Sequence, residues 1–264
     1  MPWFGGAVGE EAFCVLAGNP GPMTLDGTNT WILSAPGSTE AVVVDPGPDD
    51  ERHLQAVLEA VADRGARVVQ TLLTHGHADH SAAGRHFAQL TGAPVRALDP
   101  AHRYGGEGLT GGDVVEAGGV RLEVVATPGH TADSLSFLLP RSGSLLTGDT
   151  VLGRGTTVVA HPDGRLDAYL NSLERLRDLS GSAELRYLLP GHGPVLEQPG
   201  LVVDRYLAHR RQRLEQVRAA VDAGARTPRE VVEVVYADVD PSVWPAAELS
   251  VRAQLTYLGG TTTD

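Results

Sequence analysis

Short apolar runs, each bounded by glycine, proline or small polar residues, dominate roughly the first two hundred positions of the chain. Runs of this length and spacing are typical of β-strands. Strands are therefore predicted over residues 12–16, 29–34, 41–45, 67–74, 94–98, 120–126, 134–139, 144–147 and 185–189.

Three segments between these runs show helical spacing instead. In the first of them, Leu54, Val57 and Val61 recur at intervals that place them on one face of a helix. Helices are predicted over residues 50–63, 79–90 and 167–179. Strands mixed with helices indicate an α/β layered domain.

The pattern becomes wholly helical in the last part of the chain. Residues 201–223 carry apolar residues close to a helical period, and Gly224 suits the C-terminal cap. The four residues from Thr227 to Glu230 form a capping box with proline at the first helical position, and a last helix is predicted over residues 245–258. The chain therefore ends in a small helical unit.

Composition narrows the possible functions. Of the 264 residues 42% are apolar, which is ample for a buried core, and the excess of 33 acidic over 21 basic residues gives a net charge of −12. Such a chain repels polyanions at long range, which argues against a general nucleic-acid coat protein. Every basic residue is arginine, so P-loop, Schiff-base and Ser-x-x-Lys chemistry are excluded. The single cysteine, Cys14, excludes an intramolecular disulfide and Cys-rich zinc sites.

The N-terminal residues lack the basic segment and apolar stretch of a secretory signal. No run approaches the ~18 apolar residues of a membrane span. The expectation is a soluble, cytoplasmic protein without membrane contact, and the oligomeric state stays open.

The most informative motif is Thr74-His75-Gly76-His77-Ala78-Asp79-His80, an HxHxDH pattern. One short turn followed by a helix start would present three imidazoles and a carboxylate. Because cysteine is unavailable, metal binding must use these residue types, and they suit two adjacent cations such as zinc.

Three further candidates, His130, Asp149 and His192, each follow an apolar strand and a glycine. Sites in layered α/β folds form at the carboxyl ends of strands, where glycine allows close approach of the backbone. Convergence of these strand ends with the motif would gather five histidines and two aspartates, which indicates a two-metal site. His53, His86 and His102 are expected at the surface or in packing positions, with little effect of His53→Ala.

These segments, in the order in which they occur along the chain, resemble the motifs of the metallo-β-lactamase superfamily. More narrowly, the chain resembles the beta-lactamase-like protein 2 branch, which includes a mitochondrial endoribonuclease. The narrower resemblance rests on residues 19–30, 152–157, 169–173 and 189–194.

The resemblance implies an αββα sandwich over residues 1–200 with metals at its edge, and a small winged-helix-like domain over residues 201–264. Relatives usually continue past the last helix into a wing, whereas here Leu258 is followed only by Gly-Gly-Thr-Thr-Thr-Asp, so a truncated wing is expected. The implied ligands are His75, His77 and His130 for the first metal, Asp79, His80 and His192 for the second, and Asp149 as the bridge.

The expected enzyme is a dinuclear zinc hydrolase whose nucleophile is a hydroxide between the metals, because zinc lowers the pKa of bound water to about 7. Asp79 would orient that hydroxide. Iron or manganese occupies the same ligand set in some relatives. A metal-stabilised binding module is disfavoured because no ligand position is missing.

Two substrate classes remain open. Cleavage of single-stranded RNA follows from the branch resemblance, and several arginines on the helix at 201–223 offer a modest basic element. Thioester hydrolysis, as in hydroxyacylglutathione hydrolase or carrier-protein thioesterases, fits the acidic balance at least as well, and β-lactam hydrolysis is a weak third. RNA cleavage is the first expectation, with sensitivity to salt and to joint Arg210→Ala and Arg211→Ala changes. The expected substrate contacts are Asn29, Arg154, Thr156, Arg210 and Arg211.

Overall fold

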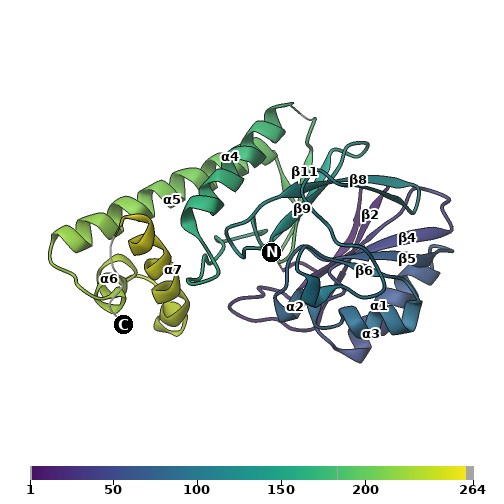
Figure 1. Ribbon diagram of the computed structural model, residues 1–264, viewed down its shortest axis with the longest axis horizontal. Coiled ribbons are helices and arrows are strands. Elements are labelled where there is room, and N and C mark those ends of the chain that lie inside the picture. Colours follow the sequence, from purple (N-terminus) through teal and green to yellow (C-terminus); the bar gives the residue numbers. More distant parts are fainter. Residues whose placement is uncertain (1, 183, 260–264) are drawn as a thin grey trace.

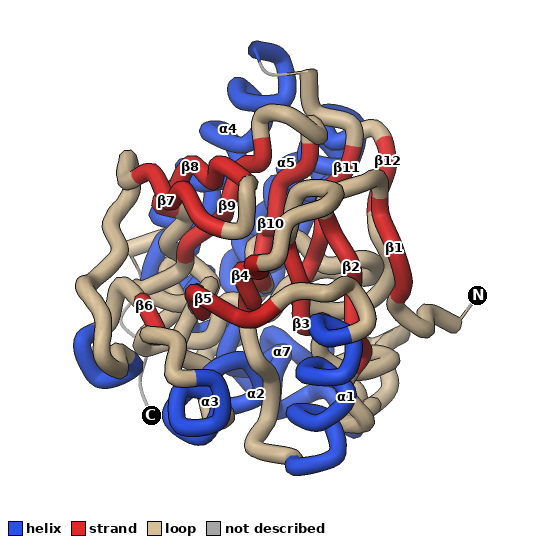
Figure 2. Tube along the Cα trace, turned by 90° about the vertical axis from the view of Figure 1, so that its right-hand side faces the viewer, coloured by secondary structure: helices blue, strands red, loops and turns tan. Residues whose placement is uncertain are grey.

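Two six-stranded mixed sheets pack face to face, with helices on their outer faces. The structure is a computed structural model that describes residues 2–182 and 184–259. In Figure 2 the strands fill the middle of the molecule, with α1 (Glu51–Ala62) and α3 (Gly84–Thr91) on one side and α4 (Leu166–Ser182) on the other. The αββα layering predicted from the resemblance is therefore confirmed.

The first sheet has the order β1-β2-β3-β4-β5-β6. Pairing is antiparallel from β1 to β4 and parallel from β4 to β6, and α1 forms the connection between β4 and β5. The short helix α2 (Ala78–Ser81) follows β5. The strands are β1 (Gly6–Val8), β2 (Ala12–Leu16), β3 (Asn29–Leu33), β4 (Glu40–Val44), β5 (Arg67–Leu72) and β6 (Val95–Arg96).

The second sheet has the order β12-β11-β10-β9-β8-β7. Only β10 and β11 pair in parallel, and α4 connects them. A 3-10 turn, η1 (Pro100–His102), lies between the two sheets in sequence. The strands are β7 (Val114–Ala117), β8 (Val120–Ala126), β9 (Leu135–Leu139), β10 (Ser144–Gly148), β11 (Tyr187–Pro190) and β12 (Leu196–Glu197).

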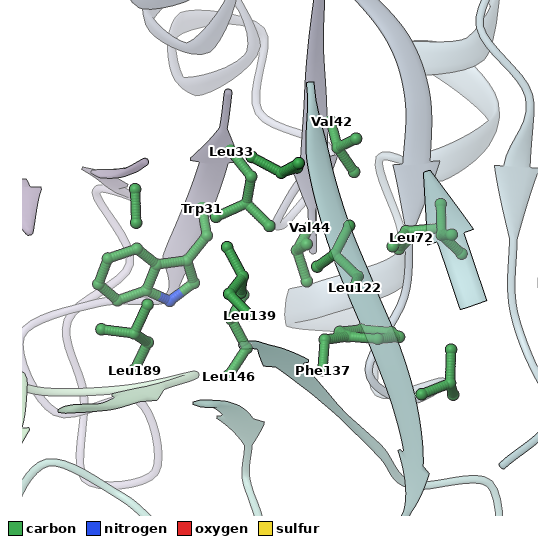
Figure 3. Close-up of a cluster of buried hydrophobic side chains, with 14 of the residues drawn as sticks. Trp31, Leu33, Val42, Val44, Leu72, Leu122, Phe137, Leu139, Leu146 and Leu189 are labelled. Carbon is green, nitrogen blue, oxygen red and sulfur yellow. The ribbon is translucent and has the colours of Figure 1, made fainter. Parts of the chain in front are cut away.

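The main core lies between the sheets (Figure 3). Trp31 and Val44 of the first sheet face Phe137 and Leu146 of the second, and each is at most 2% exposed. Residues of opposite parity on the same strands, such as Val43, pack instead beneath α1 and α3. Because both faces of these strands are covered, their sequences are continuous apolar runs rather than alternating ones.

A helical unit follows the sandwich, and one long helix joins the two (Figure 1). Its elements are α5 (Pro199–Asp222), α6 (Pro228–Val235), η2 (Pro241–Val243) and α7 (Trp244–Tyr257). The first half of α5 packs on α4 through Val203 and Leu207, whereas its second half packs on α6 and α7 through Val217 and Ala220. The predicted capping box is present at Thr227, and the expected division after residue 200 falls within the first turn of α5.

The expected truncated wing falls largely on residues 260–264, which lie outside the described residues. Among the helices that the structure does describe, none combines the length and the apolar character needed to cross a membrane.

Two features of the fold differ from the prediction. The helix predicted over residues 79–90 is interrupted between α2 and α3, where the N–H of Ala83 donates to the carbonyl of Gly47 instead of continuing one helix. The short strands β1, β7 and β12 were not predicted, because each is four residues or fewer and lies at or near a sheet edge.

His53 lies on the covered face of α1, where it is 4% exposed and its Nε2 is 2.8 Å from Oγ1 of Thr30. Of the two positions expected for His53, at the surface or in packing, the structure shows the packing position. The expected effect of His53→Ala therefore changes from little effect to loss of stability. Burial, partly offset by the negative charge of Asp50, lowers the pKa of His53 to about 4.

This lowered pKa predicts a contribution to acid sensitivity. As the pH falls from about 6.5 to about 4, the unfolded chain takes up a proton at His53 that the folded chain excludes, so stability present above this window is lost within it. We expect the wild type to lose up to about 3 kcal/mol more unfolding free energy across the window than His53→Gln. Denaturant titrations at a series of pH values measure the difference. His86→Gln, at an exposed histidine paired with Asp49, should follow the wild type, and parallel profiles for all three proteins would contradict the assignment.

Candidate metal centre

Seven histidine and aspartate side chains meet at one edge of the sandwich. Four come from the region after β5 in the first sheet, and three follow strands of the second sheet. They are His75, His77, Asp79 and His80 after β5, His130 after β8, Asp149 after β10 and His192 after β11. The structure thus brings together every residue that the sequence singles out as a metal ligand.

These side chains form three overlapping groups, and within each group the candidate ligand atoms all lie within 4.8 Å of one another. The groups are His75, His77 and His130; His75, His80 and Asp149; and Asp79, His80 and His192. The first and third groups share no residue, as two separate metal positions require.

Asp149 lies between the two outer groups. Its Oδ2 is 3.3 Å from Nε2 of His192 on one side and 3.7 Å from Nε2 of His130 on the other. A carboxylate in this place can contact a cation in either position, as the implied bridging role requires.

Two buried atoms in the site have no hydrogen-bond partner among the described residues: Nε2 of His75 and Oδ1 of Asp149. A buried polar atom left without a partner costs about 1–3 kcal/mol, so such atoms normally face a ligand. Imidazole nitrogens and carboxylate oxygens in this combination are the donor set that zinc and similar divalent metals prefer. The residues present therefore fit divalent cations.

Most of the imidazoles are oriented by a hydrogen bond at the ring nitrogen that faces away from the site. This arrangement fixes the tautomer and directs Nε2 towards the metal positions. The partners of Nδ1 are Oγ1 of Thr74 for His75, Oδ2 of Asp45 for His80, the carbonyl of Val158 for His130 and the carbonyl of Gly27 for His192. His77 differs, because its Nδ1 lies 3.1 Å from Nε2 of His130 and so faces the site itself.

Mutual charge interactions hold both site carboxylates ionised. Burial opposes ionisation of Asp149, but the positive charges of His192 and His80 keep its pKa well below the usual range. Burial is likewise outweighed at Asp79, where a hydrogen bond from His192 and the charge of His80 lower the pKa to about 2. Burial also disfavours the charged form of the His192 imidazole, but the carboxylates of Asp149 and Asp79 outweigh this effect and raise the pKa of His192 to about 10. Cation binding would release the protons held by such imidazoles.

Asp45 is a supporting residue that sequence reasoning missed. It is buried at the end of β4 in a left-handed backbone conformation, with φ of 53°. Its carboxylate accepts from the backbone N–H and the Oγ1 of Thr74, at 2.7 and 2.6 Å, and contacts Nδ1 of His80 at 2.8 Å. The sequence does contain a pattern that could have indicated Asp45. This residue follows an apolar strand and precedes Pro46-Gly47, and the candidate metal ligands likewise lie next to strand ends and glycines.

Gly191 explains why glycine precedes His192. A Cβ atom at this position would lie 2.4 Å from Oδ1 of Asp149 and 2.7 Å from Cε1 of His80. Any side chain here would therefore displace two candidate ligands.

The residues expected to contact substrate are mostly engaged elsewhere. Asn29 is fully buried, and its amide donates to the carbonyls of Pro190 and Gly193, so it supports the loop that carries His192. Arg154 pairs with Asp26 at 2.6 Å, and Thr156 lies on the wall of a neighbouring cavity.

The two helix arginines also have structural partners. Arg210 is 7% exposed, donates to the carbonyl of Thr157 and lies over the ring of Tyr169. Arg211 pairs with Glu174 of α4 at 2.8 Å. The structure does not present this pair as a free basic surface, because α5 packs against α4 and the loop after Asp149.

The ligand arrangement predicts the metal content. Protein purified without chelators should contain close to two divalent metal ions per chain, because two separate ligand groups share a bridging carboxylate. Elemental analysis against protein concentration measures this ratio. One ion or none per chain would reject the dinuclear arrangement.

Two known family models match this chain. Residues 23–192 match the family model of the metallo-beta-lactamase superfamily, and residues 227–258 match that of the beta-lactamase associated winged helix domain. The second match coincides with α6 to α7, where the sequence predicts a winged-helix-like unit.

Two relatives and one solved structure illustrate the similarity. The chain is 32% identical over 253 residues to the beta-lactamase-like protein 2 homolog of Caenorhabditis elegans, covering 92% of this chain and 82% of that protein. It is 33% identical over 238 residues to the atrochrysone carboxyl ACP thioesterase of Aspergillus fumigatus, covering 84% and 72%. A metallo-beta-lactamase family protein from Thermus thermophilus shares the fold with a TM-score of 0.78 at 24% identity, over 94% of this chain and 93% of that one.

Proposed function

Because this chain belongs to the metallo-beta-lactamase superfamily, whose members are metal-dependent hydrolases, we propose that it is a two-metal hydrolase of acyl thioesters. The observation that carries the hydrolase assignment is the convergence of seven candidate ligand side chains, two of which have a buried polar atom without a hydrogen-bond partner among the described residues. We further propose zinc as the metal, with iron or manganese able to use the same ligands.

The chain's own residues have distinct tasks in this scheme. His75, His77 and His130 would hold one cation, Asp79, His80 and His192 the other, and Asp149 both. When bound, such cations polarise the substrate oxygen and lower the pKa of water to about 7. Asp79, whose side chain is 28% exposed and ionised, is placed to orient a water molecule by accepting its hydrogen bond, while Oγ1 of Thr28 donates to its Oδ2.

The charges around the site favour a thioester over a phosphodiester. Binding of an RNA backbone requires cations free to contact phosphates. Arg154 and Arg211 are each paired with a carboxylate, Arg210 is buried, and Arg213 lines a cavity of about 270 Å³ rather than an extended basic surface that a polynucleotide backbone could follow. The net charge of −12 adds a long-range penalty for a polyanion.

A cavity of about 270 Å³ beside the site supports the same choice. Apolar side chains, including Met23, Val158 and Val239, form much of its wall. The carbonyl of Val158 is bonded to Nδ1 of His130, so the cavity adjoins the ligand shell. An acyl chain fits these surroundings, and the similarity to a fungal protein named as an ACP thioesterase supports a thioester substrate.

Cleavage of single-stranded RNA is the second candidate. It is favoured by the similarity to a beta-lactamase-like protein 2 homolog over 92% of this chain and by the winged helix domain match. Under this alternative, activity should fall steeply with added salt as phosphate contacts are screened.

One preparation assayed on simple acyl thioesters and on unstructured RNA decides between them. We expect thioester turnover that is lost in Asp149→Asn and changes little between about 50 and 200 mM salt. RNA cleavage that survives Asp149→Asn would mark a contaminating nuclease. Salt-sensitive RNA cleavage that disappears in Asp149→Asn, without thioester turnover, would overturn the proposal.

A further inference from the structure

The cavity beside the metal centre lies between the sandwich and the C-terminal helices. One wall is formed by Pro22 and Met23 in the loop before β3, and a second by the segment 156–158. Residues of α5 and α7 close the remaining side. In Figure 1 these two helices lie side by side, at the end of the molecule away from α1 and α3.

One cavity wall is bonded directly to a candidate metal ligand, and the loop that forms another wall is bonded to a second ligand a few residues further along the chain. The carbonyl of Gly27, in the same loop as Met23, accepts from Nδ1 of His192. In the segment 156–158, the carbonyl of Val158 is bonded to Nδ1 of His130. A substrate whose scissile carbonyl lay at the metals would have to pass His130 and Val158 to place one arm in this cavity.

The charge of this cavity is opposite to that of the chain as a whole. Among the described residues that line it there is no aspartate or glutamate, but there are two arginines and a histidine: Arg210, Arg213 and His209. The guanidinium of Arg213 donates to the carbonyl of Val235 and to Oε1 of Gln216, and lies 4.6 Å from the ring centroid of Tyr236. Neither arginine forms an ion pair with a carboxylate of the described residues.

Two nitrogens in this wall are buried without a hydrogen-bond partner in the described part of the chain: Nε of Arg210 and Nδ1 of His209. Burial and the charges of Arg210 and Arg213 lower the pKa of His209, so its imidazole is neutral at pH 7 and can donate one hydrogen bond. Buried nitrogens that lack a hydrogen-bond partner, in electropositive surroundings, suit a bound anion.

We propose that this cavity is an acyl subsite selective for an acyl group that ends in a carboxylate. The inference rests on the proposed thioester function. The apolar part of the acyl chain contacts Met23, Val239 and Val243, and the terminal carboxylate binds Arg213 and His209. The phosphate of a carrier arm is a poorer candidate, because it stays at the carrier surface, at the end of the arm farthest from the thioester that must lie at the metals.

Adipate and hexanoate test the subsite without any turnover, since they have the same chain length and differ by one carboxylate. Calorimetric titration of the metal-loaded protein should show adipate binding at least about tenfold more tightly, as expected for a charge-assisted pair of hydrogen bonds. Arg213→Gln should remove this preference. Arg218→Gln, at an exposed arginine paired with Glu215 on the same helix, should retain it.

Met23 provides a second pair of variants that does not depend on the partly buried guanidinium of Arg213. Its side chain is exposed at the cavity rim, so Met23→Glu should fold normally and reduce the preference for adipate over hexanoate by repulsion of the terminal carboxylate. Met23→Gln, which removes the same apolar contact from both acids, should retain that preference. Equal affinity of the wild type for both acids, or an adipate preference that survives both Arg213→Gln and Met23→Glu, would overturn the subsite.

Adipoyl and hexanoyl thioesters then separate the two proposals. An adipate preference with no thioester turnover would retain the anion subsite and reject the thioesterase assignment. Turnover of both thioesters at equal kcat/KM, with equal acid binding, would retain the thioesterase and reject the subsite.

Discussion

Replacing Asp149 with asparagine should abolish turnover and empty both metal positions while the sandwich stays folded. The Asp149 carboxylate lies between the two outer ligand groups, and its Oδ1 has no hydrogen-bond partner among the described residues. An amide carries no charge, and its NH₂ group would direct donors at a cation. Even the outer hydrogen-bond partners of metal ligands are worth about 10–100-fold in affinity or activity, so a loss well beyond about 100-fold in kcat/KM is expected.

Elemental analysis, kcat/KM and circular dichroism together measure these effects. Asp167→Asn is the matched control, because Asp167 is an exposed carboxylate paired with Arg165 on the surface. Its metal content and activity should equal those of the wild type. Retention of two ions and normal turnover in Asp149→Asn would reject its role as a shared ligand.

Asp45→Asn should weaken metal binding although Asp45 is not itself a ligand. Three donor groups, two from Thr74 and one from His80, meet two carboxylate oxygens at this residue. An amide would turn its NH₂ towards one of them and leave that donor unsatisfied. We expect metal affinity to fall about 10–100-fold and the free energy of unfolding to fall by about 1–3 kcal/mol.

Competition with a chromogenic chelator and denaturant titration of the metal-free protein measure the two quantities separately. Asp49→Asn serves as the control, since Asp49 pairs with His86 at the surface. If Asp45→Asn lowered stability but left metal affinity unchanged, Asp45 would support only the fold and not the orientation of His80.

The metal ligands could be predicted because their signal is local. Four of them lie in one heptapeptide, and each of the other three follows an apolar strand and a glycine. The strand 120–126 is found with the predicted bounds for the same reason, since apolar and charged residues alternate from Val120 to Val124 between turn residues, as in a β-strand. The sequence also predicts that the strand ends meet, because sites in layered folds form where strands end.

Contacts between distant positions set the limit of that reasoning. Asp45 shares the local pattern of the ligands, but its role depends on His80, 35 positions away. From the sequence alone, Arg154 and Arg211 are expected to be free cations, but their carboxylate partners lie 128 and 37 positions away along the chain. Arg210 reads as part of a basic helix face, yet the packing of α5 buries it against Thr157 and Tyr169. No local pattern reports such pairings.

The long helix α5 determines where this protein can be divided. Its 24 residues correspond to about 36 Å of continuous helix, and one half completes the core beneath α4 while the other half anchors α6 and α7. A fragment ending at residue 200 would lack Val203 and Leu207 from its own core and would leave Leu173 exposed. The catalytic half is therefore not autonomous without α5, and the two halves should unfold in one cooperative transition. A cut in the short turn at Gly224, beyond the end of that helix, would keep α5 with the sandwich but would remove Val217 and Ala220 from the core of α6 and α7.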